Sequence, residues 1–187
     1  MKIARYRMGR RVGYGIVEDG VLYAAQGQGL GRLRRAARIA PVDQASLLPP
    51  TRPSKIVAVG KNYLDHAQEM GSGAPQEPLI FLKATSALIG DGDPIVIPKD
   101  VGRVDYEGEL VAVIGRRARN LTEAQALDAV AGYTCGIDVT ARDLQSKDGQ
   151  WTRAKSFDTF ASVGPVIETA MAPGGRRIRT RLNGRVV

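Results

Sequence analysis

Cysteine and histidine are almost absent from this sequence of 187 residues, which contains one of each, Cys135 and His66. A single cysteine excludes an internal disulfide framework, and it gives no reason to place the chain outside a reducing cytoplasm. Zinc sites built from two or three His or Cys ligands of one chain are excluded for the same reason. Carboxylate sites for hard cations such as Mg²⁺ remain open.

Long apolar runs are also absent, because no stretch of about 18 uninterrupted apolar residues exists. The first five residues lack the apolar stretch of a signal peptide. Membrane spanning and export are therefore not expected, and we expect a cytoplasmic protein. Hydrophobic residues make up 43% of the chain and charged residues 25%, which is the balance of a soluble globular domain with, at most, a small appendage.

The formal net charge of +8 raises the possibility of nucleic-acid binding. Arginines concentrate between residues 5 and 38 and between residues 176 and 185, but aromatic residues are only 5% of the chain and do not interleave with them. No helix-turn-helix, zinc-finger or RNA-binding pattern accompanies the charge. We therefore expect no nucleic-acid partner, and this alternative depends on charge alone.

Two regions are indicated along the chain, separated by the prolines between residues 49 and 53. Residues 1–50 predict a small N-terminal domain, with short strands over 1–25, a hairpin turn at Asp19-Gly20 and a short basic helix over 29–39. Residues 54–187 predict a larger domain. Its predicted elements are a buried strand (55–60), helices (62–70 and 122–131), strands (95–97, 104–114 and 133–139) and a flexible stretch (146–150). The fold class is therefore α+β and mainly β.

The last residues predict half of a hairpin. Apolar and arginine residues alternate over 177–182, Asn183-Gly184 is a favoured two-residue turn, and a return strand begins at Arg185. A strand without its partner leaves an unpaired edge. We therefore expect either a C-terminally shortened form of a longer protein or a sheet that another chain completes.

Three carboxylates are candidate ligands for a divalent cation. Glu107 and Glu109 lie on one face of the predicted strand, in line with apolar positions, and Asp138 ends another apolar strand. Like charges on such a face are costly unless a cation neutralises them, and an oxygen site of this kind suits Mg²⁺ or Mn²⁺. The alternative, exposed glutamates and a helix-capping aspartate, stays open from spacing alone.

His66 and Glu69 are three residues apart in the predicted helix, so the carboxylate can orient the imidazole, and such a pair can deprotonate a water molecule. Arg142 and Gln145 follow at helical spacing, and Lys155 supplies a further cation. Cationic and amide donors beside a metal suit the carboxylate and the developing enolate of a small oxo acid. Each of these residues alone is also compatible with an ordinary surface position.

Taken together, six ordered blocks resemble the fumarylacetoacetate hydrolase superfamily. The resemblance extends over about residues 54–167, and the blocks are VGKNYLDHAQEM (59–70), FLK with SALIG (81–83 and 86–90), DYEGEL (105–110), AGYT (131–134), DVTARDLQ (138–145) and QWTRAKSFD (150–158). It implies a mixed β-roll or sandwich with a small N-terminal domain, in a homodimer. Members usually continue about a hundred residues further, with strands that close the roll and a loop that contacts substrate.

The resemblance also implies roles for individual residues. Glu107, Glu109 and Asp138 would bind Mg²⁺, or alternatively Mn²⁺ or Ca²⁺. His66, Glu69 and Lys155 would be catalytic, while Lys83, Arg142 and Gln145 would hold substrate oxygens. The implied reaction is hydrolysis of a C–C bond in a 2-oxo or 2,4-dioxo acid, such as an acylpyruvate. Isomerisation of a dienedioate in aromatic catabolism, decarboxylation of oxaloacetate, and an inactive subunit or binding protein are the alternatives.

Overall fold

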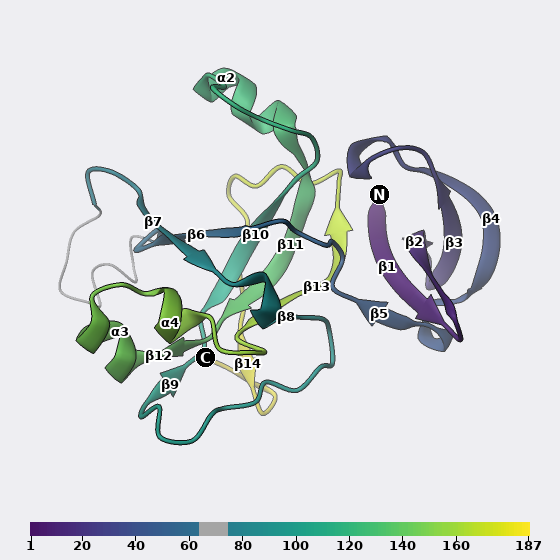
Figure 1. The fold of residues 1–187 in the computed structure, drawn as a ribbon. Coiled ribbons are helices and arrows are strands. Elements are labelled where there is room, and N and C mark those ends of the chain that lie inside the picture. Colours follow the sequence, from purple (N-terminus) through teal and green to yellow (C-terminus); the bar gives the residue numbers. More distant parts are fainter. Residues whose placement is uncertain (64–74) are drawn as a thin grey trace.

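A computed structural model describes residues 1–63 and 75–187 and confirms the mainly β fold class, with 43% strand against 15% helix. No helix in these two ranges is long and apolar enough to span a membrane. Figure 1 shows the strands crossing the middle of the molecule, with the helices at its periphery.

The first fifty residues form a curved antiparallel meander, drawn in purple and blue in Figure 1. Its strands are β1 (Lys2–Met8), β2 (Arg11–Glu18), β3 (Val21–Gln26), β4 (Arg34–Pro41) and β5 (Ser46–Leu48), with 3₁₀ turns η1 (Leu30–Arg32) and η2 (Val42–Gln44). The predicted turn between β2 and β3 is confirmed, since Asp19 and Gly20 both have positive φ, at 49° and 74°.

The helix predicted over residues 29–39 is wrong. The chain forms one 3₁₀ turn there and then enters β4, which pairs antiparallel with β3 from Val21↔Pro41 to Gln26↔Arg34. Two breaks in this register interrupt the alternation of side chains that would have revealed a strand. Pairing with a neighbouring strand therefore overrides the local helix propensity of the arginines and alanines.

The rest of the chain wraps short strands and helices around a central sheet. Its strands are β6 (Ile56–Gly60), β7 (Leu79–Lys83), β8 (Leu88–Ile89), β9 (Val104–Asp105), β10 (Gly108–Ile114), β11 (Val130–Asp138), β12 (Thr140–Ala141), β13 (Ala161–Glu168), β14 (Arg181–Leu182) and β15 (Arg185–Val186). Its helices are α2 (Glu123–Ala126), α3 (Arg142–Asp148) and α4 (Thr152–Lys155), with 3₁₀ turns η3 (Thr85–Ala87) and η4 (Leu127–Ala129).

One mixed sheet joins the two parts, in the order β10-β11-β13-β1-β2-β3-β4. β5 pairs with β1, and β8 pairs parallel to β13. The link between the parts is short, because β1 and β13 meet only at Lys2↔Glu168 and Ile3↔Ile167. The boundary between domains 1–50 and 54–187 stays a prediction, since the sheet is continuous across it.

Several local predictions need correction. The strand predicted over 104–114 is divided into β9, which pairs with β12, and β10, which pairs with β11. Residues 95–97 form no strand, and the Val96 amide donates to Thr159 Oγ1 instead. The stretch predicted to be flexible, 146–150, largely continues α3, which ends at Gly149 with a φ of 68°. Over 177–182, only Arg181–Leu182 is strand.

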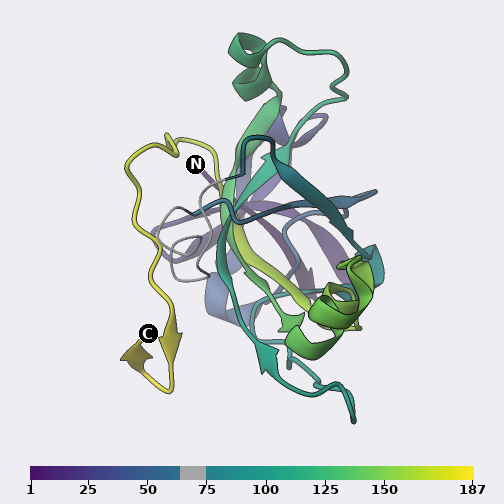
Figure 2. The ribbon, with the colours of Figure 1, turned by 90° about the vertical axis from the view of Figure 1, so that its left-hand side faces the viewer.

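Other predictions agree with the structure. A helix follows Thr122, whose amide is capped by the Gln125 side chain, although α2 and η4 together end at Ala129. β11 contains the strand predicted over 133–139, apart from its last residue. Asn183 and Gly184 form the two-residue turn between β14 and β15. In Figure 2 this hairpin lies apart from the central sheet. Residues 64–70 of the predicted helix 62–70 lie outside the described residues.

Two buried clusters stabilise the fold. One contains Ile3, Ile16, Val113 and Ile167 and connects the N-terminal meander with the central sheet. The other contains Val101, Val139, Ala141 and Phe160 and lies beneath the ends of β11 and β12. The second cluster packs next to the strand ends that carry the candidate site, so the site has a rigid base.

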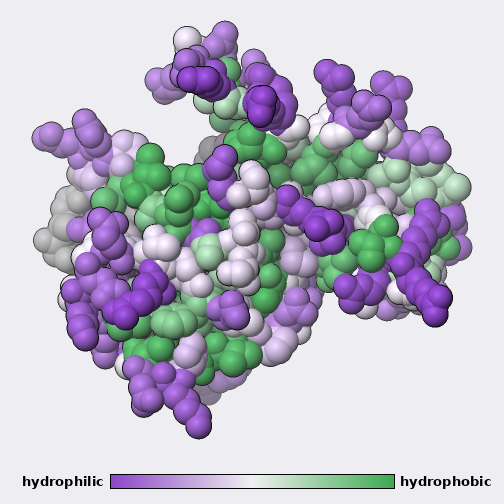
Figure 3. Space-filling view, in the orientation of Figure 1, coloured by the Kyte–Doolittle hydropathy of each residue, from purple (hydrophilic) through white to green (hydrophobic). Residues whose placement is uncertain are grey.

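The buried strand predicted over 55–60 exists as β6, but it is only partly buried. Val57, Val59, Ile80 and Leu82 of β6 and β7 are all more than 40% exposed. Figure 3 shows apolar surface where Figure 1 draws these two strands. β6 and β7 pair with each other in a separate two-stranded sheet, and the opposite face of this ribbon, with Phe81, faces the candidate site.

Replacing Ile167 by alanine tests the first cluster. Ile167 is fully buried at the contact between the meander and the sheet, so Ile167→Ala should lower the free energy of unfolding by about 2–5 kcal/mol in urea denaturation. The matched control is Val12→Ala on β2, where the side chain is 49% exposed and the loss should be below about 1 kcal/mol. Equal losses in the two variants would contradict this account of the core.

Candidate active site

The candidate site is a cavity of about 870 Å³ between the β6–β7 ribbon, the start of β10 and the two helices α3 and α4. Most of the charged residues predicted as site residues contribute to its walls. The lining residues that carry the argument below are Lys61, Phe81, Arg103, Asp105, Glu107, Glu109, Asp138, Arg142, Gln145, Trp151 and Lys155.

Strand pairing places Glu107 beside Asp138, two of the three predicted carboxylates. β10 and β11 are antiparallel, with Gly108 opposite Ile137, so the start of β10 meets the end of β11. The Asp138 amide donates to the Glu107 carbonyl oxygen at 2.9 Å, which fixes these two residues side by side. The sequence prediction placed the carboxylates on the ends of neighbouring strands; Glu109 and Asp138 lie at such ends, in β10 and β11, whereas Glu107 directly precedes β10. Their role as metal ligands stays a prediction.

Lys155 lies at the centre of the charge cluster. Its ammonium donates to Glu107 Oε2 at 2.8 Å, to Asp138 Oδ2 at 2.7 Å and to Thr140 Oγ1 at 2.7 Å. The Lys155 side chain is 2% exposed, and these three acceptors satisfy all three of its N–H groups. A buried ammonium without them would carry a large desolvation cost, so the carboxylates and Lys155 depend on one another.

Lys83 binds the same aspartate from another side. Its ammonium lies 2.5 Å from Asp138 Oδ1 and 3.4 Å from the Val139 carbonyl oxygen, and the side chain is 4% exposed. Burial lowers the pKa of Lys83, although Asp138 partly offsets this effect. Lys83 does not line the main cavity but a smaller one, of about 260 Å³, behind it. Its predicted contact with substrate oxygens stays a prediction.

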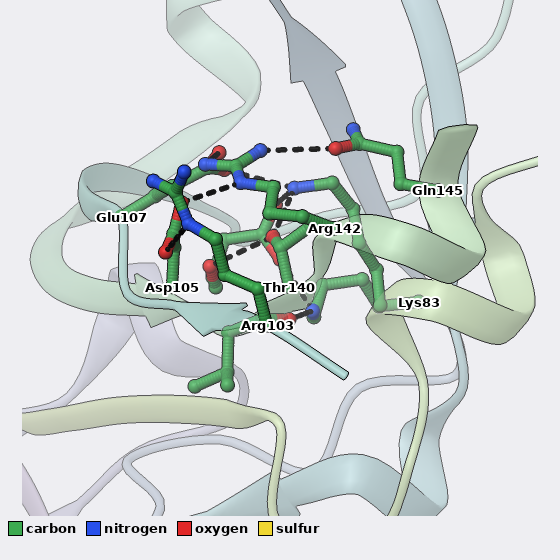
Figure 4. Close-up of polar contacts among 10 residues, drawn as sticks. Lys83, Arg103, Asp105, Glu107, Thr140, Arg142 and Gln145 are labelled. Carbon is green, nitrogen blue, oxygen red and sulfur yellow. Dashed lines mark hydrogen bonds and ion pairs between the residues drawn. The ribbon is translucent and has the colours of Figure 1, made fainter. Parts of the chain in front are cut away.

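Arg142, the first residue of α3, connects a second group of side chains. Its guanidinium donates to Asp105 Oδ2 at 2.8 Å, to Glu107 Oε1 at 2.6 Å and to Gln145 Oε1 at 3.0 Å. Figure 4 shows this side chain among its three partners, and Arg103 beside Asp105. The predicted helical spacing of Arg142 and Gln145 is therefore present in α3, whereas the contacts of Arg142 to Gln145, Asp105 and Glu107 were not predicted.

The two glutamates of the cluster have opposite pKa shifts. Burial raises the pKa of the Glu107 carboxyl, but Lys155 and Arg142 more than offset burial, so its pKa lies below the ordinary value. Burial raises the pKa of Glu109 above the ordinary value, and the charges of Glu107 and Asp138 add to that increase. Glu109 makes no ion pair with any residue that the structure describes.

Glu109 is held by two neutral side chains. Hydrogen bonds from Tyr63 and Asn62 partly offset the increase in its pKa, and the Tyr63 hydroxyl also accepts from the Leu110 amide at 3.1 Å. Burial in turn raises the pKa of the Tyr63 hydroxyl. This half-buried carboxylate thus faces two others without a cation beside it in the described part of the site.

The carboxylate oxygens of the cavity are ligands of the type that a divalent cation prefers, but among the described residues their present arrangement does not form a metal site. Within residues 1–63 and 75–187, no three His, Cys, Asp or Glu side chains are grouped closely enough to hold a metal ion. The Lys155 ammonium lies between Glu107 and Asp138, where it neutralises two of the three carboxylates. Three carboxylates line the cavity, and Glu109 pairs with no cation in the described part of the chain, so this donor set fits a hard cation if the Lys155 ammonium moves away.

The sequence analysis missed some residues of the site. Two residues that it did predict lie outside the described part of the chain. Asp105 and Thr140 belong to the network, and Thr140 follows Asp138 at the period-two spacing of one strand face. Trp151 and Phe81 form one wall, with ring centroids 5.3 Å apart in an edge-to-face contact. His66 and Glu69 fall within residues 64–74, so their predicted roles stay predictions.

Comparison with protein families identifies the chain. Residues 55–187 match the model described as fumarylacetoacetate (FAA) hydrolase C-terminal, and residues 1–50 match one described as Rv2993c-like, N-terminal. The chain belongs to the fumarylacetoacetate hydrolase family. The resemblance inferred from the sequence blocks is therefore confirmed.

Curated relatives of this family member carry several names. Protein Rv2993c of Mycobacterium tuberculosis is 50% identical over 149 residues, which are 78% of this chain and 56% of the relative. The Xenopus laevis protein named oxaloacetate tautomerase fahd2, mitochondrial, is 44% identical over 146 residues, 75% of this chain and 46% of that protein. The chain thus covers only about half the length of these two curated relatives.

Solved structures of the family share the whole fold of this chain. A crystal structure named 2-hydroxyhepta-2,4-diene-1,7-dioate isomerase, from Mycobacterium marinum, has a TM-score of 0.90 and 39% identity. The fumarylacetoacetate hydrolase of Exiguobacterium antarcticum has a TM-score of 0.86 and 36% identity. Each similarity covers 100% of this chain and 73% of the other.

The opposite pKa shifts of Glu107 and Glu109 predict opposite effects of neutralisation. With a chelator present at pH 7, Glu107→Gln should lower the free energy of unfolding by about 1–3 kcal/mol, because Lys155 and Arg142 lose a charged acceptor. Glu109→Gln should raise it, because a buried like charge is removed. Urea denaturation at several pH values measures both.

The pH dependence provides the control. A carboxyl whose pKa is lower in the folded than in the unfolded protein stabilises the folded state at pH values above its unfolded pKa. The stability lost in Glu107→Gln should therefore become smaller as the pH falls through the folded pKa of Glu107. A carboxyl whose pKa is higher in the folded than in the unfolded protein destabilises the folded state at high pH. The stability gained in Glu109→Gln should therefore vanish as the pH falls to about 4. Effects of the same sign at pH 7 would contradict the electrostatic account.

Proposed function

We propose that this chain is a metal-dependent enzyme that cleaves a C–C bond in 2-oxo or 2,4-dioxo acids, with an acylpyruvate or a fumarylacetoacetate-like compound as substrate. The observation that carries the proposal is the convergence of Glu107, Glu109 and Asp138 with Lys155 and Arg142 on one cavity. Family membership and the name of one related structure, a fumarylacetoacetate hydrolase, support the same chemistry.

Three carboxylates would hold the cation in this proposal. Glu107, Glu109 and Asp138 provide hard oxygen ligands of the type preferred by Mg²⁺ and Mn²⁺. A divalent cation bound there would act as a Lewis acid toward the oxygens of a 2-oxo acid and stabilise the enolate that forms. The buried pairing of Asp138 with Lys83 holds one carboxylate in a fixed orientation for this role.

The cationic and amide side chains would bind the anionic substrate. Lys155 lies at the base of the cavity and would donate to the developing oxyanion, while Arg142 and Gln145 at the start of α3 would hold the substrate carboxylate. Lys155 is buried and Arg142 is only 19% exposed on its side chain. Donors in such a water-poor setting stabilise a developing negative charge more strongly than they would in water.

His66 and Glu69 would activate water for hydrolysis. The imidazole would take a proton from a water molecule, whose oxygen adds to the 4-oxo carbon of the acylpyruvate. The bond between carbons 3 and 4 then breaks, its electron pair stays on carbon 3 as the enolate of pyruvate, and a proton completes the product. Glu69 would orient the imidazole and stabilise its protonated form.

Isomerisation or tautomerisation of an oxo acid is the second candidate. The Xenopus laevis and Rattus norvegicus relatives named oxaloacetate tautomerase are 44% and 40% identical to this chain. Moving a proton between carbon and oxygen of an oxo acid needs the enolate-stabilising groups but no activated water. Lys155 and the carboxylates around it could therefore support this reaction without His66.

Calorimetric titration tests the metal and anion sites together. We expect Mg²⁺ to bind the chain, and oxalate, a planar mimic of the pyruvate enolate, to bind only when Mg²⁺ is present. Glu109→Ala should abolish Mg²⁺ binding, because one of three charged oxygen ligands is lost. Arg117→Ala, at a distant exposed position, is the matched control and should bind as the parent does.

Other results of this titration would contradict the proposal. Absence of Mg²⁺-dependent oxalate binding would favour the inactive subunit or binding protein considered from the sequence. Binding to DNA that weakens steeply with salt would favour the alternative based on net charge.

His66→Ala separates hydrolysis from tautomerisation. If His66 is the general base, the variant should hydrolyse an acylpyruvate about 10²–10⁴-fold more slowly than the parent, while Mg²⁺ affinity stays unchanged. Enol-to-keto conversion of oxaloacetate, followed by ultraviolet absorbance, should stay near the parent rate. An undiminished hydrolytic rate in His66→Ala would show that the assignment of the base is wrong.

A further inference from the structure

One wall of the cavity is aromatic and directly adjoins the charge cluster. The Lys155 ammonium lies 5.1 Å from the centroid of the Phe81 ring, and that ring lies 5.3 Å from the Trp151 ring. Both aromatic residues line the same cavity as Lys155. A ligand anchored by its oxo-acid end at the charge cluster would therefore have an apolar surface close to the rest of its carbon chain.

The position of the Trp151 ring depends on a glycine. Gly60, the last residue of β6, has no side chain, and a Cβ atom there would overlap the Trp151 ring. The indole therefore packs directly against the β6 backbone, beside Phe81 of β7. Because strand backbone and a second ring support it, this wall is a rigid surface for an apolar group.

The described cavity offers few cations for a second carboxylate. Arg103 forms a two-pronged pair with Asp105, at 2.9 Å for each hydrogen bond. Arg142 and Lys155 are paired with Asp105, Glu107 and Asp138 as described above. Lys61 is the other cationic residue of the lining. A distal carboxylate placed against the aromatic wall would lose hydration without gaining a cationic partner there.

We infer that the Phe81–Trp151 wall is a subsite for an apolar substituent, so that the site selects 2-oxo acids with one carboxylate and an apolar tail over dicarboxylic ones. This inference rests on the proposed function, because the oxo-acid end is placed at the charge cluster. It extends that function by naming the substrate class. The preferred acylpyruvates would then carry an aliphatic or aromatic acyl group.

Two ligands of nearly the same shape test the inference. In 5-methyl-2-oxohexanoate an isopropyl group occupies the place of the distal carboxylate of 2-oxoglutarate. With saturating Mg²⁺, we expect the parent chain to bind the apolar ligand on the order of tenfold more tightly in calorimetry, since each buried methyl or methylene contributes about fourfold. Trp151 is the single tryptophan, so its fluorescence should change with this ligand and much less with oxalate.

Three variants connect the preference to the wall. Trp151→Ala should remove most of the preference and leave pyruvate affinity within about twofold. Gly60→Ala is the second variant, because its added methyl displaces the indole without removing it and keeps the preference test available if Trp151→Ala does not fold. Lys61→Met is the matched control on the same cavity and should retain the full preference.

The possible failures are distinct. Absence of Mg²⁺-dependent pyruvate binding in the parent overturns the proposed function and the inference that rests on it. Pyruvate binding together with equal affinities for the two matched ligands overturns the inference alone. Tighter binding of 2-oxoglutarate that is lost in Lys61→Met overturns it in favour of a dicarboxylic substrate held by Lys61.

Discussion

The pairing of β10 with β11 is the constraint on which the site depends, because it forces the Glu107 and Asp138 carboxylates together in a partly buried place. Two buried lysines then become necessary: Lys83 takes one oxygen of Asp138 and Lys155 takes the other. A buried ion pair of this kind contributes little net stability, but loss of one partner leaves an unpaired charge and is costly. The elements that supply the lysines, β7 and α4, are thereby fixed against the central sheet.

Glu109 differs from its neighbours because neutral groups hold it. Its raised pKa means that the carboxylate form carries a cost in the absence of a cation, whereas Glu107 gains from its charge. The two residues are only two positions apart on the chain, yet their surroundings set opposite preferences. Among the described residues the Glu109 carboxylate has no cationic partner, so a divalent cation, if bound as proposed, would remove the cost of its charge.

The sequence predicted the fold best where the pattern is local. Asp19-Gly20 and Asn183-Gly184 define turns through their own backbone preferences, and Thr122 with Gln125 begins a helix. The prediction was wrong over residues 29–39, where pairing of β4 with β3 determines the local structure. It was also wrong over residues 95–97, an apolar run that forms no strand. Period-two spacing suggested that Glu107 and Glu109 share a face, but spacing alone left open whether these glutamates are exposed. The roles of Lys83 and Thr140 were not predictable from spacing, because their contacts join residues 55 and 15 positions apart from their partners.

The cavity combines two walls with different physical demands. In the charged wall, side chains from β9, β10, β11, α3 and α4 neutralise one another. The geometry of this wall therefore depends on the positions of all these elements. The aromatic wall needs only β6, β7 and Trp151, and its support comes from backbone and ring packing. A change in the aromatic wall removes no member of an ion pair, whereas loss of one charged residue leaves its partners without a counter-charge. If the aromatic wall binds the substrate tail as inferred, substitutions there would change substrate preference without removing a member of the charged centre.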